Sequence, residues 1–177
     1  VKSNFGDQIF LSHPPHMTLY LNDFPSMEFD KDVRVFLSKW KPFQIEIEGW
    51  HVFYNDIRTG GNTVSYRVNN IGDVQAFQLE VVKTISKHRS KELMNWVKHD
   101  SFLPEMQECI KKYGYPYVGR LWIPHFAISS IEKQNFEKAW SGFSQQTPKF
   151  SFLCSKLALF EVRGEEHLFI KNYGIGS

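Results

Sequence analysis

A repeated histidine string constrains this chain more than any other feature of its sequence. His16-Met17-Thr18-Leu19 and His125-Phe126-Ala127-Ile128 each follow a proline and each lie in an apolar run typical of a β-strand. Successive side chains of a strand point to opposite faces, so each string lays a polar face over an apolar one. The two imidazoles are therefore predicted to meet across one cleft.

The segments that follow the two strings repeat one order of elements. After the first string, the sequence predicts a helix capped by Asp30 and then a strand from about Phe43 to Tyr54. A turn at Gly60-Gly61 predicts that this strand forms a hairpin with Thr63–Val68. The first half thus reads strand, helix, strand, strand.

The second half has the same pattern. An apolar stripe from Phe136 to Phe143 predicts a helix, and two further strands are expected at about 150–162 and 167–172, around a turn at Gly164. From the histidine of each string to the strand after its helix there are 27 residues in the first half and 25 in the second. This self-similarity predicts two copies of one structural unit.

The boundaries of the repeat predict a single bilobal domain. We expect lobe one at about 9–72, with a linking helix at 73–88 that Asp73 caps. A basic insertion follows at about 89–119, and lobe two spans about 120–177.

Length and composition allow a packed core without metal or disulfide support. The 177 residues are 42% hydrophobic and 16% aromatic. The net charge of +2 is too small to indicate nucleic-acid binding by itself, so any nucleotide site must be a local patch. Neither a long apolar stretch nor the order of a signal peptide is present, so we expect a soluble, cytoplasmic monomer that does not bind a membrane.

The paired strings, one in each pseudo-symmetric half before a helix and a hairpin, resemble the 2H phosphoesterase superfamily, which includes LigT-like RNA ligase and cyclic-phosphodiesterase proteins. The likeness covers about residues 9–176, and 14–19 is a close match. It implies an α+β fold with two pseudo-symmetric lobes, each an antiparallel sheet with helices, and an active groove between them. It also implies action on 2',3'-cyclic or 2',5'-linked phosphodiesters, without metal or cofactor, with RNA ends or nucleotides as partners.

Paired histidines suit this chemistry, because phosphodiester cleavage needs one base and one acid. An imidazole pKa near 6.5 lets one be neutral and the other protonated, so His16 and His125 are the predicted catalytic residues in either assignment. Thr18 is predicted to donate to phosphate. Ala127 stands where the family has Ser or Thr, and Ser129, on the same strand face about 6.6 Å further along, is the expected phosphate-binding replacement, with a water as bridge.

A run of mixed cations and aromatics, 111–120, precedes the second string. Such a mixture suits single-stranded nucleotides, whose bases stack on rings while cations meet phosphate. Tyr115, Tyr117 and Arg120 are therefore predicted to bind substrate, together with Tyr20 beside the first string. A solvated loop with buried tyrosines is an equal alternative.

The other histidines lack this paired context. His51, His88, His99 and His167 are expected to be structural or solvent-facing. The chain has no HExxH, Cys/His cluster or DxD motif, which predicts no metal site.

The sequence predicts a metal-independent phosphodiesterase or RNA end-processing enzyme, with hydrolysis and ligation both open. Ala127 favours one alternative, a catalytically weakened nucleotide- or RNA-binding module of the same fold. A scaffold whose histidine strings are coincidental is the third.

Overall fold

The computed structural model describes residues 16–98, 102–164 and 166–176, and the chain divides into two compact units. The first unit combines His16 and Met17 with 45–69 and 124–152. The second unit combines 18–44, 70–123 and the chain from Leu153 onward. Each unit therefore draws on both halves of the sequence. In the first unit, strands from the two halves pair with one another.

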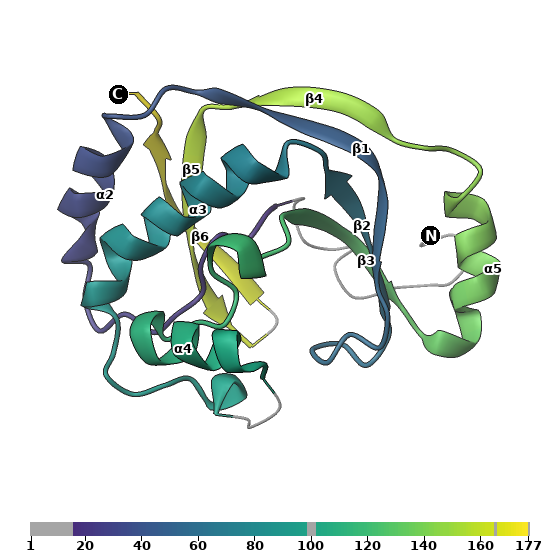
Figure 1. Ribbon diagram of the computed structural model, residues 1–177, viewed down its shortest axis with the longest axis horizontal. Helices are drawn as coiled ribbons and strands as arrows, with labels where there is room; N and C mark the ends of the chain where they lie inside the picture. The colour runs from purple at the N-terminus through teal and green to yellow at the C-terminus, as the bar shows by residue number, and fades with distance from the viewer. Residues whose placement is uncertain (1–15, 99–101, 165, 177) are drawn as a thin grey trace. The chain divides into compact units, whose positions relative to one another are not determined.

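The first unit is built on a four-stranded sheet with the strand order β3-β2-β1-β4 (Figure 1). Antiparallel pairs join β1 to β2 and β2 to β3. The elements are β1 (Phe43–Phe53), β2 (Asn62–Val68), β3 (His125–Ile131), α5 (Lys133–Phe143) and β4 (Lys149–Cys154). One face of the sheet packs against α5, because Val64 and Ile131 form a buried cluster with Phe136 and Ala139 of the helix.

The second unit packs helices against a two-stranded antiparallel sheet. Its main elements are α2 (Phe29–Leu37), α3 (Ile71–Ile85), α4 (Pro104–Tyr113), β5 (Lys156–Arg163) and β6 (Glu166–Gly174). Short 3-10 helices lie at Ser86–His88, Asn95–Val97 and Gly119–Leu121. Within the described ranges, no helix combines the length and the apolar character needed to cross a bilayer.

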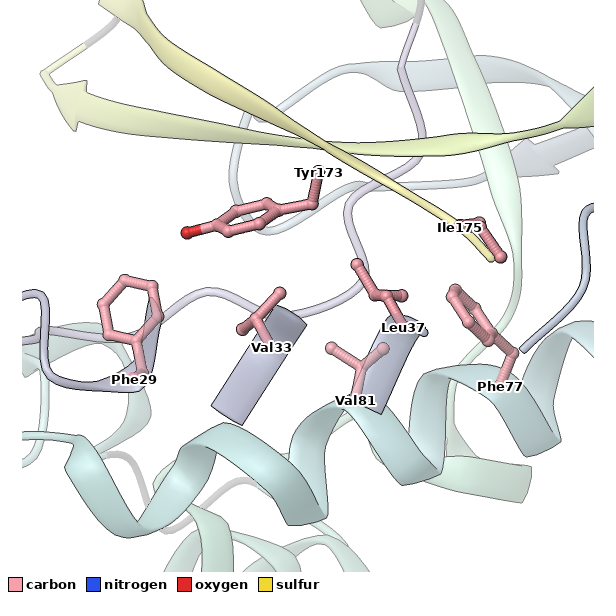
Figure 2. Close-up of a cluster of buried hydrophobic side chains, with 7 residues drawn as sticks. All are labelled: Phe29, Val33, Leu37, Phe77, Val81, Tyr173 and Ile175. Carbon is pink, nitrogen blue, oxygen red and sulfur yellow. The ribbon is translucent and has the colours of Figure 1, made fainter. Parts of the chain in front are cut away.

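The core of the second unit is formed by α2, α3 and β6. Phe29, Val33 and Leu37 recur every four residues, which sets them on one face of α2. Figure 2 shows this row facing Phe77 and Val81 of α3, Tyr173 of β6 and Ile175 just after β6. All seven side chains are buried. The core is therefore formed by the regular spacing of apolar residues along the helices and by the apolar residues at the end of β6 and just after it.

The predicted strand over the first histidine string is wrong. The chain is irregular over 16–24. Its backbone finds partners outside a strand ladder, because the fully buried Gln78 of α3 donates through Nε2 to the carbonyl oxygen of Leu19 at 2.9 Å. The Tyr20 hydroxyl donates to the carbonyl oxygen of Tyr113.

Most other predicted elements are confirmed, with two local differences. The strand expected over 150–162 is two strands, β4 and β5, which separate at Ser155 and belong to different sheets. The carbonyl oxygen of Ser155 accepts from the Ile175 amide at 2.9 Å. Asp30 and Asp73 lie in the first turns of α2 and α3 and are not their N-caps.

Asp30 instead ties α2 to β6. Its Oδ1 accepts hydrogen bonds from Lys171 Nζ and, at 2.8 Å, from the Tyr173 hydroxyl. Its Oδ2 accepts from Arg34 Nε at 3.0 Å. These donors, the Lys171 ammonium first, hold the pKa of Asp30 well below its usual range. The carboxylate therefore adds to stability where it is ionised.

Asp30→Asn should lower the melting temperature by about 2–4 °C at pH 7, which corresponds to about 1 kcal/mol for a partly exposed charged hydrogen bond. The folded-state pKa is depressed, so this contribution is full above the unfolded pKa near 3.9 and is lost as the pH falls below it. Thermal melts of both proteins should therefore converge as the pH drops from about 4 towards 2.

Asp73→Asn is the matched control, because Asp73 is also in a first helical turn but makes no ion pair with the other described residues. It should shift the melting temperature less than Asp30→Asn. Equal melting temperatures for Asp30→Asn and wild type at pH 7 would contradict the assigned role.

Candidate active site

Both predicted catalytic histidines belong to the first unit. His125 is the first residue of β3, and His16 lies just before the point at which the chain passes to the second unit. Both side chains are half-buried. Thr18, the predicted phosphate donor, is exposed and belongs to the second unit.

Antiparallel pairing decides which side chains share a sheet face with His125. Ser65 of β2 lies opposite Ala127 of β3. The neighbour Val64 lies opposite Ser129, so β3 has one more residue than β2 over this step, which is a β-bulge. Opposed residues point to the same face and successive residues alternate. Simple alternation predicts Ser129 on the face of His125, whereas the bulge places Ser129 on the other face, with Val64.

We call the other side of the sheet, away from α5, the histidine face. By register it carries His51 and Phe53 of β1, Ser65 and Arg67 of β2, and His125 and Ala127 of β3. Ring contacts agree with this register, because the Phe53 ring centroid lies 4.4 Å from that of His51 and 4.6 Å from that of His125. Two strand spacings of about 4.8 Å separate β1 from β3. The Phe53 and His125 rings therefore lean toward each other over β2.

The histidine face carries a fixed cation. Arg67 lies opposite His125 in the β2–β3 register. Arg67 Nε donates to the carbonyl oxygen of Glu48 at 2.8 Å. A Cβ at Gly49, whose φ is +91°, would lie 3.3 Å from Arg67 Nη2, so the guanidinium packs closely over the bulge in β1. Glycine at position 49 therefore allows both the positive φ and the close approach of the Arg67 guanidinium.

Burial, and next the positive charge of Arg67, lower the pKa of His51. At neutral pH this imidazole is therefore uncharged. The face offers a guanidinium that attracts phosphate and a neutral imidazole that can accept a proton.

The predicted substrate-binding tyrosines form a packed aromatic cluster in the second unit. The Tyr20 and Tyr115 ring centroids are 5.5 Å apart, and Tyr115 lies 5.7 Å from Tyr117. Tyr115 is only 6% exposed, and burial raises the pKa of Tyr20. Tyr115 therefore fits the buried-tyrosine alternative. Tyr117 is half-buried and stacks on Trp96, and Arg120 is exposed in a 3-10 helix.

Sequence reasoning missed the role of His51 and Phe53 beside His125. The two-residue spacing of His51 and Phe53 places both on one strand face, but their relation to His125 depends on pairing between the two halves. Of the histidines outside the two strings, His88 is structural, since its Nε2 lies 2.7 Å from Asp32 Oδ2. His99 lies outside the described residues.

No set of metal ligands stands out in the part of the chain that the structure describes. Within those ranges, no three or more His, Cys, Asp or Glu side chains gather as they would around a metal ion. The metal-independent mechanism stays a prediction that a chelator can test.

Comparison with known proteins identifies one family. A family model described as the 2'-5' RNA ligase superfamily matches residues 1–166. The matched range includes both histidine strings and the three strands that make the histidine face. A search of curated proteins finds no match.

The electrostatic link between Arg67 and His51 can be measured by NMR titration of the imidazole protons. His51 should titrate below 6.5, and Arg67→Gln should move its pKa part of the way back, because the effect of burial remains.

Arg58→Gln provides the control, since it removes the same charge from an exposed position in the turn after β1. It should leave the pKa of His51 nearly unchanged. A His51 pKa that does not respond to Arg67→Gln would show that the guanidinium does not act on this ring.

Proposed function

The chain belongs to the 2'-5' RNA ligase superfamily, and on that premise we propose that it is a metal-independent phosphodiesterase or RNA end-processing enzyme. Its substrates are 2',3'-cyclic or 2',5'-linked phosphodiesters at RNA ends or in nucleotides. The observation that carries the proposal is the histidine face, where His125 lies opposite a guanidinium, in the same compact unit as His16.

The two imidazoles divide the proton transfers of hydrolysis. For a 2',3'-cyclic phosphate, the neutral imidazole takes a proton from water as the water oxygen forms a bond to phosphorus. The protonated imidazole gives its proton to the ribose oxygen as the bond from that oxygen to phosphorus breaks. We assign these roles to His16 and His125 as a pair.

Charge and hydrogen-bond donors hold the phosphate during these steps. Arg67 is the cation of the histidine face, and its planar guanidinium can bond two phosphate oxygens. Thr18, an exposed residue of the first string, supplies a hydroxyl donor. Donors that meet charge developing in the transition state lower the barrier most.

A second function is a binding module for nucleotides or RNA that has lost turnover. One observation favours it, since Ala127 offers no hydroxyl two residues after His125. Such a module would bind a 2',3'-cyclic nucleotide and release it unchanged.

Turnover of the four nucleoside 2',3'-cyclic monophosphates in EDTA separates these functions. The wild type should form a nucleoside monophosphate, and His16→Ala or His125→Ala should lower kcat by about 10²–10⁴, because each removes a proton-transfer group. The melting temperatures should change little, since both side chains are only half-buried.

His167→Ala is the control, as it removes a half-buried imidazole from β6 of the second unit. Its turnover should match that of the wild type. Binding without any product would support the binding module, and activity lost in EDTA but restored by zinc or manganese would refute the metal-independent mechanism.

A further inference from the structure

The two histidine strings differ in one chemical group. Thr18 carries a hydroxyl two residues after His16, whereas Ala127 has none two residues after His125. Strand pairing places a hydroxyl beside this position, because Ser65 lies directly opposite Ala127. Opposed residues of an antiparallel pair have Cβ atoms about 4.5–5.5 Å apart, and both point to the histidine face.

Ser65 differs from the other hydroxyl residues on the histidine face. Thr63 Oγ1 donates to Asp56 Oδ2 at 2.6 Å, and Ser130 Oγ donates to Thr59 Oγ1 at 2.6 Å. Residues of the turn after β1 therefore accept a hydrogen bond from each of these two hydroxyl groups. Ser65 is fully buried, and its Oγ has no hydrogen-bond partner among the described residues.

A buried hydroxyl without a partner lowers stability, so it calls for an explanation. Alanine at position 65 would avoid this loss in the protein alone. The Ser65 hydroxyl forms a favourable hydrogen bond only when a bound ligand accepts it. Proteins commonly give up some stability at binding sites in this way.

The surroundings of Ser65 belong to the candidate active site. His51 lies opposite Ser65 on its other side, in β1. The Phe53 and His125 rings meet over β2, the strand that holds Ser65. Arg67, two residues further along β2, points to the same face about 6.6 Å away along the strand. The Ser65 side chain thus lies on the same sheet face as an imidazole and a guanidinium.

We propose that Ser65 donates to the substrate phosphate the hydrogen bond that Ala127 cannot give. The inference rests on the proposed function and assigns the missing donor of the second string to the neighbouring strand. A phosphate at His125 and Arg67 reaches the hydroxyl when the Phe53 ring turns aside and Ser65 rotates about χ1, which has three staggered positions. No covalent bond to Ser65 forms in this step.

Exchanging the two side chains tests the proposal. Ser65→Ala should lower kcat/KM for nucleoside 2',3'-cyclic monophosphates by about tenfold to a hundredfold, because it removes a donor to a charged group. The double variant Ser65→Ala/Ala127→Ser returns a hydroxyl to the same face and should recover most of that loss. Ala127→Ser alone should change little, since Ser65 already donates.

Ser129→Ala is the matched control. Ser129 is also fully buried, and its Oγ also has no partner among the described residues, but the bulge places it on the opposite face. Both single serine variants should melt at or above the wild-type temperature, because each removes an unsatisfied hydroxyl. Only Ser65→Ala should lose activity.

Isothermal titration with adenosine 2'-monophosphate keeps the inference distinct from the proposed function. If His125→Ala is inactive while Ser65→Ala keeps full activity, the enzyme stands and the role of Ser65 is overturned. If the wild type has no turnover, the proposed function fails. If wild type and Ser65→Ala then also bind adenosine 2'-monophosphate with equal affinity, this inference is overturned as well. Weaker binding by Ser65→Ala that Ala127→Ser restores would support it. A double variant that recovers neither binding nor turnover would overturn it.

Discussion

The antiparallel pairing of β2 with β3 determines which residues of this chain can act together. These strands come from different halves of the sequence, and their register sets Arg67 opposite His125 and Ser65 opposite Ala127. A single extra residue in β3 then turns Ser129 to the face that packs on α5. Without that bulge, Ser129 instead of Ser130 would share the face of His125.

The first histidine string depends on a different kind of interaction. Gln78, wholly buried in α3, donates to the carbonyl oxygens of Leu19 and Tyr117 and accepts from the Gly119 amide through its Oε1. One amide side chain thereby satisfies backbone groups of two irregular segments, which otherwise would lose hydrogen bonds on burial. The end of the first string is therefore held in place without belonging to a sheet.

Local patterns in the sequence predicted most elements but not their partners. The alternation in Phe43–Phe53 correctly predicted a strand, and the apolar stripe of α5 correctly predicted a helix. Each pattern depends only on the periodicity of its own segment. The pairing of β3 with β2, the break at Ser155 and the bulge depend on contacts between distant segments, which periodicity does not encode. For the same reason His51 had no visible partner in the sequence, although its ring contacts Phe53 beside His125.

We propose that the imidazoles of the two strings bind one phosphate beside the histidine face. A crystal structure of the protein with adenosine 2'-monophosphate measures this directly. We expect the phosphate on this face, with a ring nitrogen of His16 and one of His125 each within about 3.5 Å of its oxygens. A phosphate bound elsewhere, or imidazoles more than about 10 Å apart in the complex, would contradict it, because one small anion cannot then bond to both.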